Sequence, residues 1–223
     1  AGLQVVGRSL LAGRRPVVLG DGEPLAAAAA RMPPDDRRYL SLVPTQLRRW
    51  LAAEPDALRT FDAVLVGGAA ADPHLLDRAR AEDVRVVTTY GMTETAGGCV
   101  YDGVPLAGVG VRVRDGIELA GPVLALGYRG DPAGTAEAFA DGWFRTRDAG
   151  ALDAAGRLTV HGRLDDVVVS GGVNVVPQAV EAALRSHPDV ADAVVLGLPD
   201  PEWGRRVVAA VVPAAASVPE LAA

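Results

Sequence analysis

Short apolar runs alternate with stretches of helical periodicity over roughly the first hundred residues. Three of the runs end at glycine or polar residues, and we expect strands there: residues 16–19, 63–66 and 84–89. Leu47 and Leu51 share one face of a helix that we expect over residues 44–52. Asp72 and Pro73 are typical of the start of a second helix, which we expect to reach Arg80. This alternation predicts an α/β fold, in which a parallel sheet carries helices on both faces.

The pattern changes between residues 103 and 162, where glycines recur every few positions and the apolar runs become short. We expect strands at residues 109–113, 117–120 and 158–161, and a hairpin connection over residues 152–158. Short strands separated by turn residues are typical of all-β units. This region therefore predicts a small antiparallel β-barrel, with a sandwich as the alternative.

A third pattern begins after Asp166 and mixes strands with one helix. We expect strands at residues 167–169, 193–196 and 207–212, and a helix beginning near Pro177. Residues 213–223 are rich in alanine and proline and resemble the first turns of another helix. These expectations divide the chain into an α/β subdomain, a β-barrel subdomain, a hinge and a partial C-terminal α+β domain: residues 1–102, 103–162, 163–166 and 167–223. Both ends look truncated, and we expect the chain to be a piece of a longer protein.

The composition excludes several classes of protein. Of 223 residues, 49% are hydrophobic and the net charge is −6, which is typical of a soluble globular protein. An acidic balance argues against nucleic-acid binding, which requires a basic surface. No apolar run approaches the roughly 20 residues that cross a bilayer. The single cysteine, Cys99, excludes an internal disulfide and suits a reducing cytoplasm.

The basic side chains are unusual because all 22 are arginine. A planar guanidinium does not replace the compact ammonium of lysine in every reaction. Any chemistry that depends on lysine must therefore obtain it from outside this sequence. The three histidines are far apart and lack the spacing of metal ligands, so we expect no metal site from them.

Four segments combine glycine with side chains that can carry chemistry: residues 64–70, 89–95, 142–150 and 162–177. Taken alone, each is also explained as a turn, a helix cap or a charged linker. Small residues after the first strand would let a flat ring lie against the backbone, where open α/β sheets bind ligands. In the other segments, Tyr90 offers a stacking face, Thr93 a hydroxyl, and Glu94 an oxygen ligand for Mg²⁺. Asp148 offers a carboxylate that could accept two hydrogen bonds from a ribose.

In this order and at this spacing, the segments resemble the adenylate-forming superfamily, which contains acyl-CoA synthetases, peptide-synthetase adenylation domains and luciferases. Residues 117–129 (IELAGPVLALGYR) add a fifth matching segment, so the resemblance covers nearly the whole chain. Within the superfamily, the o-succinylbenzoate–CoA ligases of menaquinone synthesis look most similar. That likeness depends on residues 41–47, 64–71 and 170–177 in combination.

The resemblance implies roles for individual residues. Tyr90 would stack on adenine. Thr93 and Glu94 would be the catalytic residues, because Thr93 would hold the α-phosphate and Glu94 would bind Mg²⁺. Asp148 and Arg163 would hold the ribose. The implied nucleotide site comprises Gly68, Ala69, Tyr90, Gly91, Thr93, Asp148 and Arg163. Gly67 and Thr89 would line the acyl pocket, Ser41 would approach the carboxylate end of the acid, and Asp165 would be the hinge.

The resemblance also implies an activity. An acid and ATP would give an acyl-adenylate and pyrophosphate, and coenzyme A would then form a thioester. The partners would be ATP, Mg²⁺, coenzyme A and a small aromatic carboxylic acid, with a homodimer as an open alternative.

Two family features are missing: the glycine-rich phosphate loop that lies upstream, and a lysine near the C-terminus. We therefore expect the 223-residue chain alone to be inactive. Two alternatives stay open. One is a ligase for another aryl or fatty acid, and the other is a non-catalytic module that binds a nucleotide or a partner.

Overall fold

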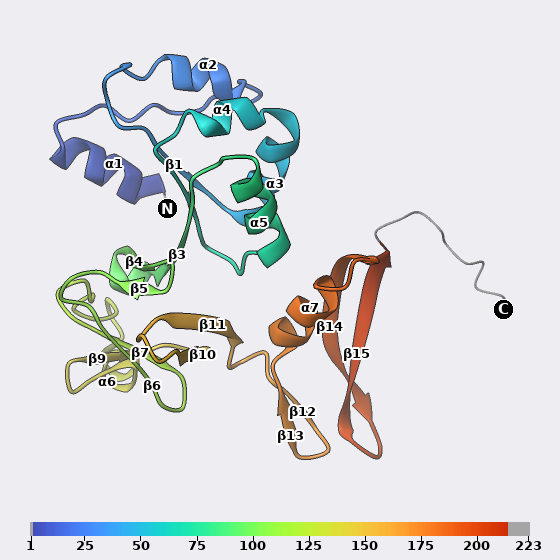
Figure 1. The fold of residues 1–223 in the computed structure, drawn as a ribbon. Coiled ribbons are helices and arrows are strands. Elements are labelled where there is room, and N and C mark those ends of the chain that lie inside the picture. The colour runs from blue at the N-terminus through green and yellow to red at the C-terminus, as the bar shows by residue number, and fades with distance from the viewer. Residues whose placement is uncertain (1, 214–223) are drawn as a thin grey trace.

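The computed structural model describes residues 2–213, with three successive parts along the chain (Figure 1). The helix expected over residues 213–223 lies outside the described residues, apart from Pro213. No helix in the described part of the chain is long and apolar enough to cross a membrane.

The first part contains a five-stranded sheet with the order β1-β2-β3-β4-β5. Its strands are β1 (Tyr39–Leu42), β2 (Ala63–Val66), β3 (Val86–Met92), β4 (Gly97–Tyr101) and β5 (Val104–Pro105). The first three run parallel, as expected, and β4 and β5 extend the sheet in antiparallel pairs. Because Leu42 pairs with Val66 and Val66 with Thr88, the carboxyl ends of the parallel strands lie along one edge.

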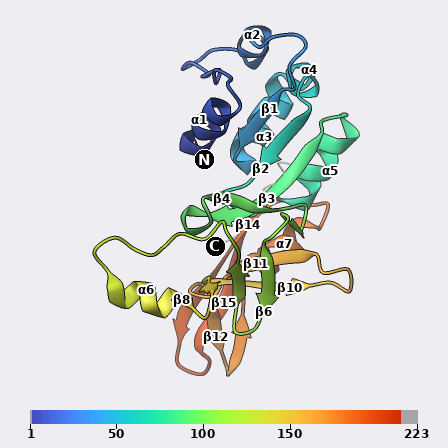
Figure 2. The ribbon, with the colours of Figure 1, turned by 90° about the vertical axis from the view of Figure 1, so that its left-hand side faces the viewer.

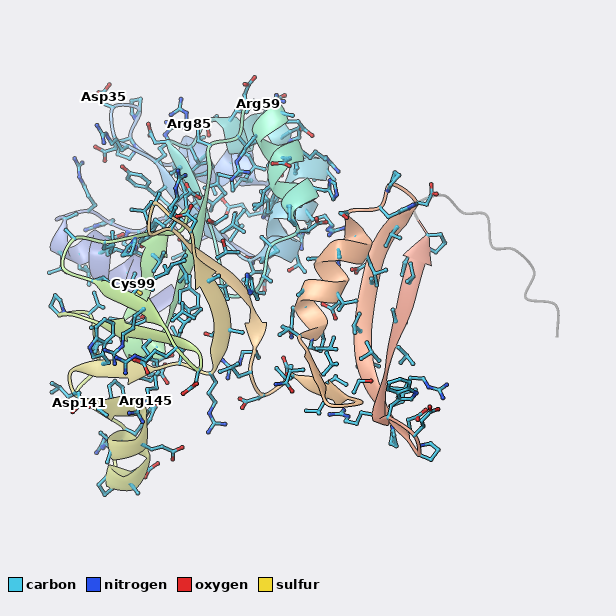
Figure 3. The ribbon with its side chains drawn as sticks, turned by 60° about the horizontal axis from the view of Figure 1, so that its bottom comes forward. Asp35, Arg59, Arg85, Cys99, Asp141 and Arg145 are labelled. Carbon is cyan, nitrogen blue, oxygen red and sulfur yellow. The ribbon has the colours of Figure 1, made fainter. Side chains whose placement is uncertain are left out.

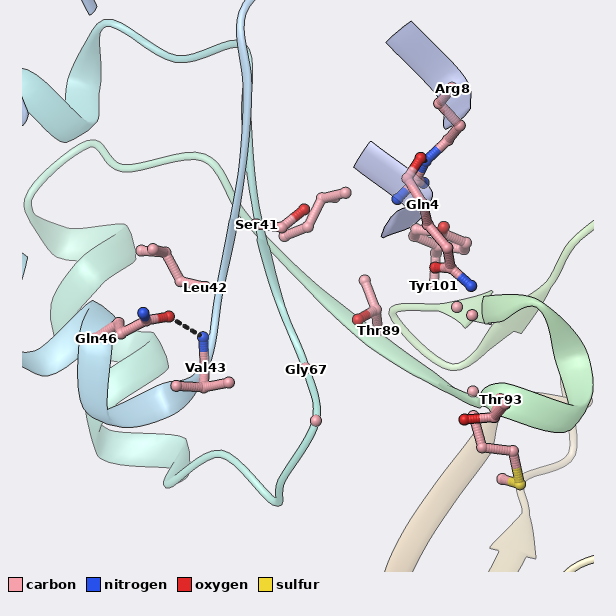
Figure 4. Close-up of a pocket in the computed structure, with 16 residues that line it drawn as sticks. Gln4, Arg8, Ser41, Leu42, Val43, Gln46, Gly67, Thr89, Thr93 and Tyr101 are labelled. Carbon is pink, nitrogen blue, oxygen red and sulfur yellow. Dashed lines mark hydrogen bonds between the residues drawn. The ribbon is translucent and has the colours of Figure 1, made fainter. Parts of the chain in front are cut away.

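Helices cover both faces of this sheet, as the alternation predicted. They are α1 (Gly2–Leu11), α2 (Leu25–Ala30), α3 (Pro44–Ala53), α4 (Pro55–Arg59) and α5 (Pro73–Ala81). Val64 and Val66 of β2 are buried in a core formed with α2 to α5, whereas Leu65 lines the opposite side together with Gln4 of α1. Figure 2 shows α1 apart from the other helices, across the sheet. Figure 4 shows Gln4 and Arg8 of α1 on the side of Ser41 and Thr89. The main buried members of that core are Leu25, Leu47, Trp50, Leu51, Leu58, Phe61, Leu75 and Leu76.

The strand expected at residues 16–19 is wrong, because residues 14–20 form no regular secondary structure. The carbonyl of Val18 accepts a hydrogen bond from the Arg31 side chain at 2.8 Å, not from a neighbouring strand. Val18 is also 72% exposed. Its apolar character does not reflect a place in the sheet.

The middle part is antiparallel, but it does not close into a barrel. The strands β6 (Gly110–Val113), β7 (Ile117–Ala120), β9 (Trp143–Arg145) and β8 (Phe139–Ala140) form one sheet in that order, beside α6 (Pro132–Ala138). The strands β10 (Asp148–Leu152) and β11 (Leu158–Arg163) pair only with each other. The four-stranded sheet keeps free edges at β6 and β8, so the expected barrel is replaced by two small sheets.

A small apolar cluster joins the middle part to the end of the first sheet. Cys99 and Val100 of β4 pack with Ile117 and Leu119 of β7, and Cys99 lies in the interior (Figure 3). The ring of Tyr90 packs against the same cluster. This packing holds the carboxyl end of β3 against the antiparallel sheets.

The third part follows β11 and contains β12 (Val168–Ser170), β13 (Val173–Val175), α7 (Pro177–Arg185), β14 (Val190–Asp200) and β15 (Gly204–Pro213). The strands form two antiparallel hairpins, and α7 lies along β14 (Figure 1). No described strand pairing continues across residues 164–167, between β11 and β12. The strands and helix expected here are confirmed, with longer final strands than the pattern predicted.

Candidate functional site

A pocket of about 300 Å³ lies at the carboxyl ends of β1, β2 and β3 (Figure 4). Six residues that the sequence singled out line it: Ser41, Gly67, Gly68, Thr89, Gly91 and Thr93. Gln4 and Arg8 reach it from α1, and Tyr101 from β4. The pocket therefore collects side chains from segments that are almost a hundred residues apart in the sequence.

Two glycines shape the wall of this pocket because the chain passes too close for a side chain. A Cβ at Gly67 would lie 2.2 Å from the Thr89 hydroxyl oxygen. A Cβ at Gly91 would lie 1.9 Å from the carbonyl oxygen of Gly97. Both glycines are therefore explained by close packing within the protein, and the expectation that small residues leave the backbone open to a ligand stays a prediction. Ala69 lies in the exposed loop after β2 and is not among the lining residues.

On the other side of β3, three residues from distant segments meet. The Tyr90 hydroxyl donates a hydrogen bond to Asp148 at 2.7 Å, and an Arg163 guanidinium nitrogen lies 3.3 Å from the second Asp148 carboxylate oxygen. Asp148 and Arg163 are also paired across the β10–β11 hairpin. The Asp148 backbone N–H is held by Thr146, which in turn donates to the Ile117 carbonyl. Asp148 is thus a fixed and buried carboxylate.

The electrostatics of this group favour a neutral tyrosine. Burial raises the pKa of Tyr90 well above its usual value, and the hydrogen bond to Asp148 raises it further. Tyr90 therefore stays a donor across the physiological pH range. An ionised carboxylate has about four acceptor positions, and Tyr90 and Arg163 occupy two of them. No other side-chain donor among the described residues bonds to the Asp148 carboxylate.

Beyond β3, the short helix η1 (Thr93–Thr95) carries the next two candidates. The Thr95 hydroxyl is buried and donates to Gly97, and it also accepts from the Met92 backbone, which fixes the turn. Thr93 is exposed at the mouth of the pocket. Glu94 is half-buried and accepts a hydrogen bond from the Tyr128 hydroxyl at 2.9 Å.

The residues around Glu94 indicate which kind of metal site its carboxylate could belong to. Among residues 2–213, no three His, Cys, Asp or Glu side chains gather closely enough to hold a metal ion. Mg²⁺ in nucleotide enzymes commonly takes one or two carboxylates together with phosphate oxygens and water. Glu94 therefore fits a cation that arrives with a nucleotide, and it does not fit a resident all-protein site.

The expected hinge residue is tied to the same cluster. Asp165 lies 3.3 Å from a guanidinium nitrogen of Arg147 and 3.5 Å from one of Arg163. Arg163 thus contacts both Asp148 and Asp165. The side chains of Arg147, Arg163 and Asp165 are about half-exposed, and ion pairs of this kind contribute at most about 1 kcal/mol each to the stability of the fold.

Models of known protein families match two segments of the chain. The model of the AMP-binding enzyme family matches residues 9–121, which is half of the chain. The chain belongs to the AMP-binding enzyme family. The model of the AMP-binding enzyme C-terminal domain matches residues 179–223 as well.

Individual AMP-binding enzymes show the same relationship. The chain is 50% identical to a probable 2-succinylbenzoate–CoA ligase of Mycobacterium tuberculosis over 95% of this chain and 58% of that one. It is 37% identical to a feruloyl-CoA synthase of an Amycolatopsis species, over 74% and 38% of the two chains. The solved o-succinylbenzoate-CoA synthetase MenE of Bacillus subtilis, in complex with the acyl-adenylate OSB-AMP, matches with a TM-score of 0.70 at 31% identity. That match covers 79% of this chain and 41% of the solved chain. The chain spans about half the length of the curated relatives that it matches.

Four lining or supporting residues were missed by sequence reasoning: Gln4, Arg8, Tyr101 and Tyr128. Gln4 and Arg8 lie four apart on α1, on one helix face, which was a signal available in the sequence. Tyr128 lies in the fifth matching segment, but nothing in that pattern indicates which residue its hydroxyl meets.

Proposed function

We propose that this chain is part of an ATP-dependent carboxylate–CoA ligase that activates o-succinylbenzoate as an acyl-adenylate. The observation that carries the proposal is the meeting of Tyr90, Asp148 and Arg163 on one side of β3, with a pocket lined by Ser41, Gly67 and Thr89 on the other side. A carboxylate with two free acceptor positions suits the two hydroxyls of a ribose. The neighbouring pocket suits the acyl group that would be joined to the same nucleotide.

The two-step reaction assigns a task to each group. The substrate carboxylate attacks the α-phosphorus of ATP, pyrophosphate leaves, and the thiol of coenzyme A later displaces AMP. Thr93 at the pocket mouth would donate to the α-phosphate, and Gly68, Ala69 and Gly91 would contact the nucleotide through backbone. Glu94 would hold Mg²⁺, which supplies charge neutralisation on the phosphates when bound. Asp165 would be the pivot between the two steps.

The preference for a dicarboxylic acid is supported by Arg8. It is the only cation among the residues that line the pocket in the described part of the chain. A guanidinium binds a carboxylate through two parallel hydrogen bonds. An acid that places one carboxylate at the ribose side and a second near α1 would use both ends of the pocket. The alternatives are a ligase for a monocarboxylic aryl or fatty acid, and a module without catalysis.

Two further assignments belong to the proposal. Cys99 is fully buried, which raises the pKa of its thiol and protects it from oxidation, so nothing here requires an oxidising compartment. The use of ATP and coenzyme A suits the cytoplasm. The homodimer considered from the sequence stays a prediction.

Arg8→Gln tests the substrate class in a completed enzyme. We define the completed enzyme as this chain joined to the flanking segments of the M. tuberculosis relative. The variant is expected to lower kcat/KM for o-succinylbenzoate roughly 10- to 100-fold, because a charged hydrogen-bond pair is lost. With 4-oxo-4-phenylbutyrate, which lacks the ring carboxylate, the same change should cost less than about threefold. Steady-state pyrophosphate release measures both.

Arg14→Gln is the matched control, since Arg14 pairs with Asp36 at 2.7 Å and does not line the pocket. This control should leave kcat/KM for both acids unchanged. Equal losses with the two acids on Arg8→Gln would refute the role of Arg8 in selectivity. If the unaltered completed enzyme turned over the monocarboxylic acid but not o-succinylbenzoate, the aryl-acid alternative would be favoured.

A further inference from the structure

Glu94 is held from two directions by the loop that follows β7. The Glu94 backbone carbonyl accepts a hydrogen bond from the Ala125 N–H at 2.7 Å. The Glu94 side chain accepts one from the Tyr128 hydroxyl at 2.9 Å, and only through Oε1. Within residues 2–213, Oε2 has no hydrogen-bond partner, so the carboxylate presents one free oxygen. The loop therefore fixes both the position of Glu94 and the direction of its carboxylate.

Tyr128 is itself fixed by contacts that do not involve its hydroxyl. Its ring packs edge-on against Phe139 at 5.6 Å between centroids, and Phe139 packs against Phe144 at 4.8 Å. Phe144 is buried in β9, four residues before Asp148, where β10 begins. The Tyr128 backbone N–H donates to the Thr135 hydroxyl at 2.8 Å. Ring and backbone thus hold the residue, and the hydroxyl is free to serve Glu94.

Each of the two carboxylates expected at the nucleotide has a tyrosine hydroxyl as a hydrogen-bond partner. Asp148 accepts a hydrogen bond from Tyr90, and Glu94 accepts one from Tyr128. In both pairs the tyrosine hydroxyl is the donor and the carboxylate is the acceptor. The row of rings that begins at Tyr128 ends at Phe144 in β9.

We infer that Tyr128 is a positioning residue that orients the Glu94 carboxylate for a divalent cation bound with a nucleotide. The inference rests on the proposed function, because it requires that a nucleotide brings the cation to Glu94. Hydrogen-bond partners of a ligating carboxylate fix its direction and strengthen metal binding. A residue that only packed would use its ring, and the loss of its hydroxyl oxygen would then change nothing at Glu94.

The test compares ATP binding with and without the cation in the full 223-residue chain. NMR titrations give the Kd for ATP in EDTA and in excess Mg²⁺, and their ratio is the Mg²⁺ enhancement. Tyr128→Phe is expected to reduce this enhancement about tenfold, or to abolish it, while the Kd in EDTA stays unchanged. Glu94→Gln should abolish the enhancement. Tyr39→Phe is the matched control, because Tyr39 is 53% exposed at the start of β1 and far along the chain from this loop.

Each outcome decides the inference. Full enhancement in Tyr128→Phe would overturn it, and so would an equal rise of the Kd in EDTA and in Mg²⁺, which is the signature of a purely structural role. Absence of ATP binding by the unaltered chain in both conditions would sink the proposed function and this inference together. Thermal unfolding of Tyr128→Phe should match that of the unaltered chain, since the ring contacts remain.

Discussion

The 223-residue chain alone is expected to release no pyrophosphate above background from ATP and o-succinylbenzoate, whereas the completed enzyme should turn over. All 22 basic side chains of the chain are arginine, and this family's pattern uses a mobile lysine and an upstream glycine-rich loop at the phosphates. Preorganised charge is usually the largest catalytic contribution, and one missing donor costs roughly 10²- to 10³-fold in kcat. Losing two such elements therefore places the rate below detection. A coupled pyrophosphate assay on both proteins measures this.

The controls for this experiment separate three explanations. The resemblance implies a lysine near the C-terminus of the completed enzyme, and its change to alanine should remove most of the activity. Acid-dependent release by the chain alone would mean that an arginine supplies the missing charge, and the account of the lysine would then be wrong. If the completed enzyme were active only with fatty acids, the family assignment would stand, but o-succinylbenzoate would be excluded as the substrate.

Asp148→Ala is expected to raise the KM for ATP of the completed enzyme roughly 10- to 100-fold, because charged hydrogen bonds to the ribose are lost. Asp148 is only 6% exposed and is the acceptor for both Tyr90 and Arg163. Asp148→Asn keeps the side-chain volume and should show most of the same loss. Steady-state kinetics at varied ATP concentration give the value.

Asp115→Asn is the matched control for this change, since Asp115 lies exposed in the turn between β6 and β7. It should leave the KM for ATP unchanged. If Asp148→Asn also left that KM unchanged, Asp148 would not be a ribose ligand. The cluster with Tyr90 and Arg163 would then be explained by structure alone.

Local patterning was sufficient to predict most elements of this fold. The strand 63–66, the helices beginning at Pro44 and Pro73, and the final hairpin strands all have strong periodicity or clear first and last residues. The closed barrel was wrong because turn spacing predicts strands but does not say which strands pair. β10 and β11 pair only with each other, and that choice depends on tertiary packing.

The site was predictable in part for a physical reason. Gly67 follows β2 and Thr89 lies in the carboxyl-terminal half of the neighbouring parallel strand β3, so their meeting at one sheet edge could be expected from topology. Arg8 and Tyr128 could not be placed in that way. α1 reaches the pocket through packing on the sheet, and the Tyr128 hydroxyl meets Glu94 across 34 residues of chain.

A crystal structure of this chain with a non-hydrolysable o-succinylbenzoyl-adenylate analogue would test the central claim most directly. The account predicts the ribose hydroxyls within about 2.6–3.2 Å of the Asp148 carboxylate. It also predicts the acyl group in the pocket between Thr89 and Arg8. An adenosine bound away from Asp148, or an acyl group outside this pocket, would contradict the account.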